Sequence, residues 1–332
     1  MKNDANPIAD RFLVIAGTSK AGTTSVFSYL ANHPQICAAE KETRFFLDTG
    51  YPLSSKARYE KDSPEAYLSL FNCGPPENWR LEATPDYLYS ANTPYFIRQT
   101  LANVRLVFIL REPISRLLSW YRFARKRTVI PDDMTFDDYV SIQRDGGTRV
   151  RQQRAHPAFY ALEHGRYSVY LRTYLELFGE SSVYISFYED LRRDALGFII
   201  PICRWIGIDE AYFHNFQFDI INKGSDVHSR YLHKAYMESG RRARSLLRHA
   251  PPKLQLLLRQ IRPRVDAIYA KLNVAESKEL RMSAATKEFL RLYYRDEPTR
   301  LREILGVEVP WPSNPLAAST ELESNLSEQR AR

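Results

Sequence analysis

The stretch that most constrains the fold is "RFLVIAGTSKAGTTSVFSYLANH", at residues 11–33. An apolar run of strand length leads into a loop bounded by Gly17 and Gly22, and then into a segment with helical periodicity. Such a turn presents backbone N–H groups and a helix N-terminus to an anion. The usual loop of this kind, G-x-x-x-x-G-K-[ST], has a lysine that reaches a γ-phosphate. Here Thr23 takes that position and Lys20 lies inside the loop, so we expect a shorter, diphosphate-like ligand.

Segments typical of strands and helices alternate along the first two thirds of the chain. The strand-like runs, rich in β-branched and aromatic residues, are Arg11–Ala16, Trp79–Glu82, Arg105–Leu110 and Val183–Phe187. The amphipathic, helix-like segments include Thr24–Ala31, Pro113–Arg127, Phe136–Gln143 and Tyr167–Phe178. This alternation predicts an α/β fold, with a central parallel sheet covered by helices on both faces. Such sheets bind ligands at the carboxyl ends of their strands, where the glycine-bounded loop, "KETRFF" and "LREPISRLLS" all occur.

The C-terminal third of the chain becomes helical and basic after Phe213. We expect two helices joined at Pro251–Pro252, within a segment, 230–271, that holds eleven Lys and Arg residues and two acidic residues. The net charge of the chain is +8, so this segment accounts for the excess of positive charge. It is suited to an anionic polymer or an acidic membrane surface, or it forms a solvated helix face; we expect no nucleic acid partner.

We expect a single domain over residues 11–312, with a helical C-terminal part, after an N-terminal extension at 1–10. Residues 313–332 lose all periodicity and are expected to form a flexible tail. No apolar run reaches the length of a membrane-spanning helix, and the N-terminus lacks the apolar core of a signal peptide. Three cysteines, an odd number, predict a reducing compartment and no disulfide framework. These features favour a cytoplasmic location, which is compatible with peripheral binding at the inner membrane face.

A second constellation lies in "RLVFILREPISRLLSWYRFARK". Arg111 ends a strand-like run, Pro113 opens a helix at the position where proline is best tolerated, and Ser119 falls eight residues after Arg111. An arginine fork and a serine hydroxyl at this spacing can converge on one phosphate group. The seven histidines show no spacing typical of metal ligands, so we expect no metal.

These motifs, in this order, resemble those of the sulfotransferase family that uses 3′-phosphoadenosine 5′-phosphosulfate (PAPS). Ser19–Ser25 is similar to the family's 5′-phosphosulfate loop, and Arg111–Ser119 matches its 3′-phosphate motif, R-[DEN]-P-x-x-R-x-x-S, at every fixed position. The stretch "EKETRFF", Glu40–Phe46, resembles the K-E-x-[HR]-F-F segment of the heparan-sulfate type and its bacterial relatives. The resemblance covers residues 11–210 and implies a P-loop NTPase-like sulfotransferase fold.

The resemblance also implies a role for each motif residue. Lys20 would bind the 5′-phosphosulfate and neutralise charge on the departing oxygen, and Arg111 and Ser119 would hold the 3′-phosphate. Glu42 would be the catalytic base that takes the proton of the acceptor hydroxyl. The remaining residues of the phosphosulfate loop that would contact the nucleotide are Ala21, Gly22, Thr23, Thr24 and Ser25.

Two positions depart from the family's patterns. Ala83, in "LEATP", stands where heparan-type enzymes have a lysine that binds the polymer, which argues against a heparan-like acceptor. The family's K-G-R loop over the 3′-phosphate has its nearest counterpart in "NKGSDVHSR", where Lys223 and Arg230 are the candidate nucleotide contacts.

The resulting hypothesis is an enzyme that moves sulfonate from PAPS to an acceptor hydroxyl and releases 3′,5′-bisphosphoadenosine (PAP), without a metal. The acceptor would be a small molecule or a glycan, with a carbohydrate or glycolipid favoured. One alternative is a divergent P-loop kinase, although the sequence lacks an evident magnesium aspartate and γ-phosphate lysine. The other is a basic anion- or membrane-binding protein with a relict nucleotide site.

Overall fold

The computed structural model describes residues 8–72, 79–131, 133–145, 156–219, 226–227, 274–275 and 282–311. The chain divides into two compact units, one of residues 1–120, 135–221 and 282–332, the other of residues 121–134 and 222–281. The first unit contains the central sheet and the motifs of the first 120 residues. Lys223, Arg230, the basic segment 230–271 and the tail 313–332 lie outside the described residues, so the expectations for them stay predictions.

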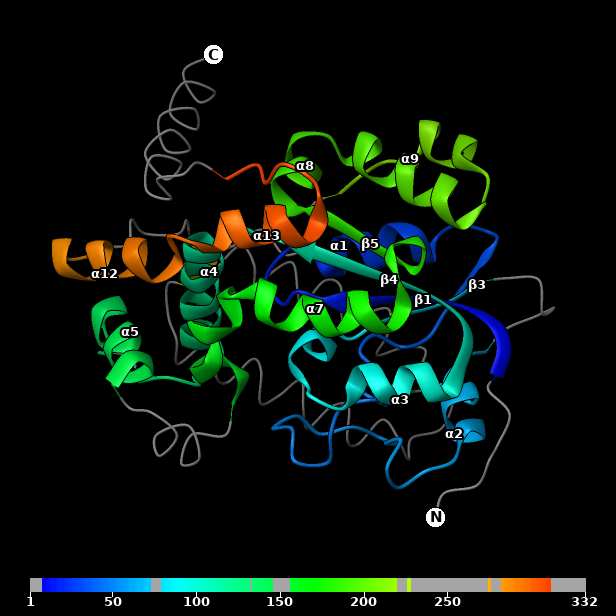
Figure 1. Cartoon of the computed structure of the whole chain (residues 1–332), viewed down its shortest axis with the longest axis horizontal. Helices are drawn as coiled ribbons and strands as arrows, with labels where there is room; N and C mark the ends of the chain where they lie inside the picture. Colours follow the sequence, from blue (N-terminus) through cyan, green and yellow to red (C-terminus); the bar gives the residue numbers. More distant parts are fainter. Residues whose placement is uncertain are drawn as a thin grey trace. The chain divides into compact units, whose positions relative to one another are not determined.

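The first unit is built on a five-stranded, all-parallel sheet with the order β2-β3-β1-β4-β5 (Figure 1). Its strands are β1 (Ile8–Gly17), β2 (Ile36–Ala38), β3 (Trp79–Ala83), β4 (Leu101–Leu110) and β5 (Val183–Phe187). The four predicted strands are therefore confirmed. The edge strand β2 was not predicted, because three residues are too few to show a pattern.

Helices follow the strands in the order that parallel connections require. The α-helices of the described chain are α1 (Thr23–Ala31), α2 (Pro64–Leu68), α3 (Thr93–Thr100), α4 (Pro113–Lys126), α5 (Phe136–Asp145), α7 (Tyr167–Phe178), α8 (Tyr188–Arg193), α9 (Ala195–Ile206), α12 (Ala284–Tyr294) and α13 (Glu297–Leu305). The 3₁₀ helices are η1 (Pro85–Tyr89), η2 (Pro157–Tyr160), η3 (Glu163–Gly165), η4 (Glu180–Ser182) and η5 (Glu210–Asn215). Helices α12 and α13 lie in the C-terminal part that was expected to be helical, whereas the two helices expected around Pro251–Pro252 fall outside the described residues.

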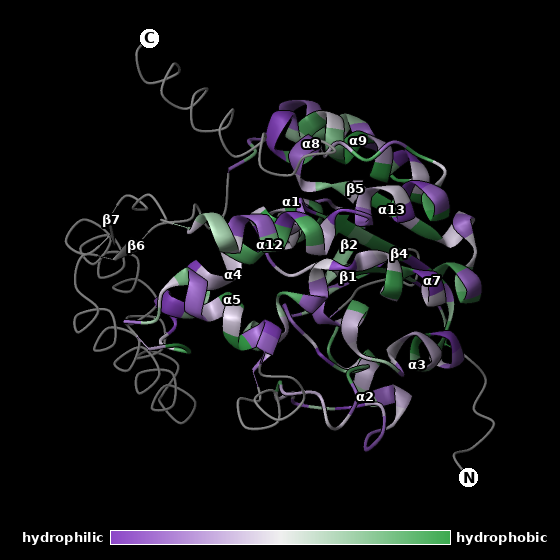
Figure 2. Ribbon diagram, turned by 60° about the vertical axis from the view of Figure 1, so that its left-hand side comes forward, coloured by the Kyte–Doolittle hydropathy of each residue, from purple (hydrophilic) through white to green (hydrophobic). Residues whose placement is uncertain are grey.

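Strand β1 shows why both faces of the sheet are covered. Its residues from Phe12 to Ala16 are fully buried, and successive side chains point to opposite faces. Phe12, Val14 and Ala16 join one hydrophobic cluster, and Leu13 and Ile15 join another. In Figure 2 the strands lie between helices of mixed colour, and β4 is mostly green, that is, hydrophobic. A continuous apolar run of this kind is typical of a strand buried on both sides.

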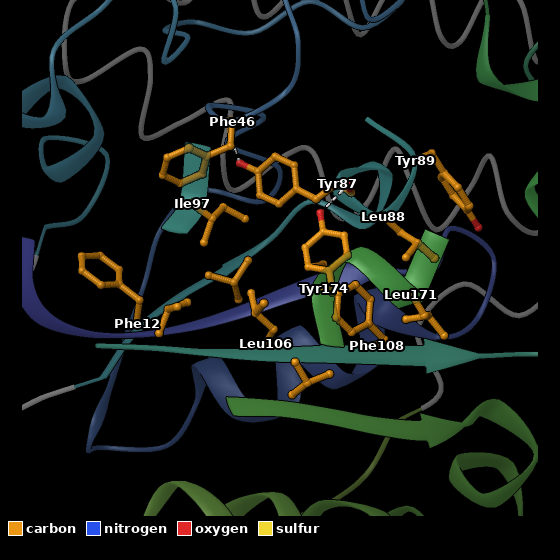
Figure 3. Packing of buried hydrophobic residues seen from close by; sticks show 14 of the residues in the cluster. Phe12, Phe46, Tyr87, Leu88, Tyr89, Ile97, Leu106, Phe108, Leu171 and Tyr174 are labelled. Carbon is orange, nitrogen blue, oxygen red and sulfur yellow. Dashed lines mark hydrogen bonds between the residues drawn. The ribbon is translucent and has the colours of Figure 1, made fainter. Parts of the chain in front are cut away.

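Helices α3 and α7 cover the first of these faces. Ile97 of α3 and Leu171 and Tyr174 of α7 pack onto strand residues such as Phe108 (Figure 3). Helices α1 and α9 cover the opposite face, with side chains in the second cluster, namely Val26, Leu30, Ile199 and Ile202. The predicted parallel sheet with helices on both faces is therefore confirmed.

In the second unit, the described residues comprise the end of α4 with the segment after it, and two short strands. Strands β6 (Asp226–Val227) and β7 (Val274–Ala275) pair antiparallel. The Tyr121 hydroxyl donates to the Met134 carbonyl oxygen at 2.7 Å, which closes the segment after the helix onto itself.

The cysteines correct one expectation. Cys37, on the edge strand β2, is disulfide-bonded. Cys203 is free and buried in α9, where burial raises the pKa of its thiol to about 12. The expectation of no disulfide framework does not hold for Cys37, because a count of cysteines carries no information on which of them the fold brings together.

Candidate active site

The predicted site residues lie at one edge of the sheet. Because all five strands are parallel, their carboxyl ends meet there. Lys20 follows β1, Glu42 follows β2, and Arg111 follows β4. The loop after β3 adds Asp86, which the sequence patterns did not single out.

The loop between β1 and α1 holds Lys20 in an unusual backbone conformation. Its φ is +74°, in the left-handed region that a side chain with a Cβ seldom adopts. The chain before it is fixed by Thr18, whose backbone N–H and hydroxyl both donate to the Ile109 carbonyl oxygen, at 2.9 and 3.0 Å. Contacts on neighbouring residues thus hold the loop in a conformation that Lys20 alone would not favour. Backbone strain that the surroundings enforce is typical of ligand sites.

Arg111 contacts this loop directly. Its Nη1 donates to the Lys20 carbonyl oxygen at 3.1 Å, and its guanidinium lies 4.5 Å from the centre of the Tyr188 ring. The Tyr167 hydroxyl donates to the Arg111 carbonyl oxygen at 2.7 Å. The two motifs that the sequence placed about ninety residues apart are therefore in contact.

The segment after β2 brings the predicted base to the same loop. Lys41 Nζ donates to Thr24 Oγ1 at 3.1 Å and lies 3.4 Å from Glu42 Oε1. Arg44 donates to Glu42 Oε2 from Nε at 3.2 Å and from Nη2 at 2.9 Å. Arg44 itself has a left-handed backbone, with φ of +59°. The carboxylate of Glu42 is thus oriented by two cations, one of which also contacts Thr24 at the start of α1.

The remaining predicted residues occupy the expected elements. Gly22 and Thr24 are half-buried in the loop, whereas the side chains of Ala21, Thr23 and Ser25 are buried. Ser119 lies half-buried on α4. Glu112, the residue before α4, is buried and accepts from the backbone N–H groups of Ile114 at 2.9 Å and Ser115 at 2.6 Å. This cap fixes the start of α4, and with it the place of Ser119 relative to Arg111.

His33 lies just after α1. His33 is buried, and its Nδ1 accepts from the Gln35 backbone N–H at 3.1 Å, so Nε2 carries the proton and donates to the Asp209 carbonyl oxygen at 2.8 Å. Both ring nitrogens are therefore used in structural contacts. Within the described ranges, no group of three or more His, Cys, Asp or Glu side chains could hold a metal ion.

Gly22 closes the loop at the start of α1, with φ of +81°. A Cβ at this position would lie 2.7 Å from Leu191 Cδ2 and 3.0 Å from Tyr188 Cδ2. The loop therefore requires glycine at position 22, because its backbone is left-handed and because a Cβ there would have no room.

Replacing Gly22 by alanine should therefore displace the loop as well as strain it. Gly306 is a matched control, because its backbone is left-handed like that of Gly22, with φ of +65° and ψ of +12°, and a Cβ added there would have no atom within 4 Å. Both Gly→Ala variants should lose about 1–2 kcal/mol of unfolding free energy from the left-handed backbone. Only Gly22→Ala should also lose nucleotide affinity, measured by calorimetry. Equal nucleotide affinity in the two variants would contradict the proposal that this loop binds the nucleotide.

A fully buried carboxylate, Glu82 of β3, supports the segment that carries Glu42. The hydroxyls that donate to it are those of Thr43, Thr84, Tyr67 and Tyr87. Because Thr43 directly follows Glu42, these hydrogen bonds attach the predicted base segment to the sheet. Burial raises the pKa of Glu82 to about 7, and the hydrogen bonds offset part of that rise.

Because the pKa of Glu82 is raised, the contribution of this group to stability should fall as pH rises. The folded protein holds a proton on Glu82 more tightly than the unfolded chain, so this stabilising term is present below the unfolded pKa and is lost as pH rises toward about 7. Relative to Glu82→Gln, the unfolding free energy of the wild type should fall by on the order of 2 to 3 kcal/mol between about pH 5 and 8. Urea unfolding of both proteins, with the exposed Glu180→Gln as control, measures this difference. Parallel curves for the wild type and Glu82→Gln would contradict it.

The sulfotransferase domain model matches residues 10–248 of this chain. The chain belongs to the sulfotransferase domain family. Membrane-associated sulfotransferase kil1 of Dictyostelium discoideum is a relative with 35% identity over 138 residues, which cover 40% of this chain and 28% of that protein. Heparan sulfate glucosamine 3-O-sulfotransferase 5 of Mus musculus is 28% identical over 108 residues, covering 32% of this chain and 29% of that protein. The matched parts thus span less than a third of these sulfotransferases.

The fold is also that of solved sulfotransferases. The crystal structure of a sulfotransferase from Alicyclobacillus acidocaldarius superposes with a TM-score of 0.63 and 18% identity, covering 91% of this chain and 98% of that one. At this identity the likeness concerns the fold alone. In the described part of this family member, no helix has the length and apolar character needed to cross a bilayer.

Proposed function

We propose that this chain transfers the sulfonate group of PAPS to a hydroxyl of a carbohydrate or glycolipid, with Glu42 as the base. The observation that carries the proposal is the convergence of two segments on one loop. Arg111 contacts the Lys20 carbonyl oxygen, and Lys41 contacts both Thr24 and Glu42. Anion-binding groups and a carboxylate therefore lie together at the carboxyl edge of the sheet.

The residues present fit a nucleotide with a 5′-phosphosulfate and a 3′-phosphate. The loop of Gly22 and Lys20 offers backbone N–H groups and a cation to the 5′ end, and the Arg111 fork suits a phosphate. Ser119 would complete the 3′-phosphate contacts. When bound, PAPS supplies an activated sulfonate whose leaving group is already a phosphate.

Different residues of the chain remove the proton of the acceptor and stabilise the leaving group. Glu42 takes the proton of the acceptor hydroxyl as the acceptor oxygen bonds to sulfur. Lys20 balances the negative charge on the oxygen that leaves with PAP. Arg44 keeps Glu42 in one orientation through two hydrogen bonds to the same carboxylate oxygen. Orientation of this kind lowers the entropic cost of reaching the reactive arrangement.

The acceptor class rests on the family relationship and on one residue of this chain. Six relatives of the chain are named for heparan sulfate, which supports a carbohydrate acceptor. Ala83, where heparan-type enzymes have a lysine, is fully buried at the end of β3. We therefore favour a carbohydrate that is less anionic than heparan.

Transfer from radiolabelled PAPS to a panel of acceptors tests this function. The panel should hold a neutral oligosaccharide, a glycolipid, a heparan-type oligosaccharide and a phenol, in buffer with a chelator. We expect label in the neutral oligosaccharide or the glycolipid. Label only in the phenol would contradict the carbohydrate acceptor, and label mainly in the heparan-type oligosaccharide would contradict the argument from Ala83.

A further inference from the structure

Asp86 is a buried carboxylate outside the machinery described above. It lies in η1, immediately after β3, and is 5% exposed. Ser19 Oγ donates to Asp86 Oδ2 at 3.1 Å, and the Tyr51 hydroxyl donates to Asp86 Oδ1 at 2.9 Å. Each carboxylate oxygen therefore receives a hydroxyl, and the two hydroxyls come from different segments of the chain.

The first segment is the phosphosulfate loop. Ser19 directly precedes Lys20, whose backbone is left-handed. The Lys20 carbonyl oxygen accepts from Arg111 Nη1, so Lys20 is held on one side by Arg111 and on the other through Ser19 and Asp86. A contact that fixes Ser19 therefore also restricts the position of the Lys20 backbone, from which the Lys20 side chain extends.

The second segment is residues 47–62, which we call the acceptor-side loop. Arg58 organises it by donating to the carbonyl oxygens of Asp48 and Leu53 and, from Nε at 3.0 Å, to Ser55 Oγ. Arg44 joins this loop to the predicted base, because its Nη1 donates to the Ser54 carbonyl oxygen at 3.0 Å while its other nitrogens hold Glu42. The loop that carries Tyr51 is therefore linked to Glu42.

We propose that Asp86 is a positioning residue that holds the phosphosulfate loop, through Ser19, in register with the acceptor-side loop, through Tyr51. This inference rests on the proposed function, since it assigns the two loops to donor and acceptor. In-line transfer requires donor and acceptor at a set separation, and small displacements are costly. Asp86 makes the two loops one unit without contacting either substrate.

The charges around Asp86 are consistent with this role. Burial and the nearby charge of Glu42 raise the pKa of Asp86 to about 6, and the hydrogen bonds from Tyr51 and Ser19 and the charge of Arg44 oppose that rise. Above this pKa the ionised carboxylate accepts both hydroxyls. On protonation one oxygen becomes a donor and the hydroxyl facing it must accept instead, so the bridge loses the strength that the carboxylate charge gives its bonds.

A double-mutant cycle tests the bridge. Asp86→Asn, Ser19→Ala and the double variant are compared in their affinity for PAP, measured by calorimetry on the full chain. Each single change should weaken PAP binding about tenfold, because Ser19→Ala removes the hydrogen bond and Asp86→Asn removes the charge that strengthens it. The double variant should be no weaker than the single variants, because both remove the same interaction. Effects that multiply, or PAP binding by Asp86→Asn equal to the wild type, would overturn the proposal.

The acceptor arm uses Tyr51→Phe, which removes one hydroxyl. It should raise the acceptor KM in the transfer assay and leave PAP affinity within about twofold, whereas Asp86→Asn should change both. Glu297→Gln is the control for a buried carboxylate, because Glu297 is 3% exposed and accepts from the N–H and hydroxyl of Ser168. It should lower stability without a change in PAP affinity.

The outcomes separate this inference from the function on which it rests. A wild-type chain that does not bind PAP would remove the proposed function itself. A wild-type chain that binds PAP, with an acceptor KM unchanged in Tyr51→Phe, would contradict the bridge alone. If Asp86→Asn does not fold, Ser19→Ala and Tyr51→Phe still decide: wild-type PAP affinity in the first, or a wild-type acceptor KM in the second, would contradict it.

Discussion

Glu42→Gln should lower turnover by roughly 10² to 10⁴-fold and leave PAP affinity nearly unchanged. The amide keeps the shape of the side chain and can still accept from Arg44, whose Nη2 lies 2.9 Å from Oε2 of the glutamate, but it cannot take the proton of an acceptor hydroxyl. Single-turnover transfer from PAPS and a PAP titration on the same preparation measure the two quantities.

Glu40→Gln is the matched control for this prediction. Glu40 lies two residues earlier in the same segment, is exposed, and pairs with the exposed Lys56. Because exposed ion pairs contribute little, this variant should keep wild-type turnover. If Glu42→Gln also kept wild-type turnover, the base would have to be another residue.

Arg111→Ala should weaken PAP binding by roughly 10 to 100-fold, because it removes charge-assisted hydrogen bonds to a phosphate. The affinity for ADP, which lacks the 3′-phosphate, should fall much less. Some loss is expected for ADP as well, since Arg111 also holds the Lys20 carbonyl oxygen at 3.1 Å. Calorimetric titration of both nucleotides measures the difference.

Arg105→Ala provides the comparison on the same strand. Arg105 lies earlier in β4 and donates to the Ser181 carbonyl oxygen, away from the carboxyl edge. Its replacement should leave both affinities unchanged. If Arg111→Ala lowered the affinities for PAP and ADP equally, this would contradict recognition of the 3′-phosphate by Arg111. Arg111 would then only support the loop.

The long buried strands could be predicted because their pattern is local. In β1 and β4 the apolar run, the turn and the helix start are adjacent in the sequence, so the carboxyl edge of the sheet could be located as well. Strand β2 has only three residues, and its pairing with β3 depends on residues about forty positions away. Pairing over that distance leaves no periodic signal in either segment.

The supporting residues of the site are also set by distant contacts. The pattern "KETRFF" indicated Glu42, but only the structure brings Lys41 to Thr24, seventeen residues earlier. Asp86 has no motif at all, since it becomes a bridge only when Ser19 and Tyr51 reach it from 67 and 35 residues away. Motifs thus predicted the groups expected to contact the ligand, whereas the residues that orient them required the fold.

The most direct test of the account is a calorimetric titration of the full chain with PAP, ADP and ATP with magnesium. The account predicts that PAP binds in the presence of a chelator, and at least about tenfold more tightly than ADP, because the 3′-phosphate adds charge-assisted contacts. Binding of magnesium ATP in preference to PAP would contradict it and favour a kinase. Binding of none of the three nucleotides would remove Glu42 from any role in sulfonate transfer.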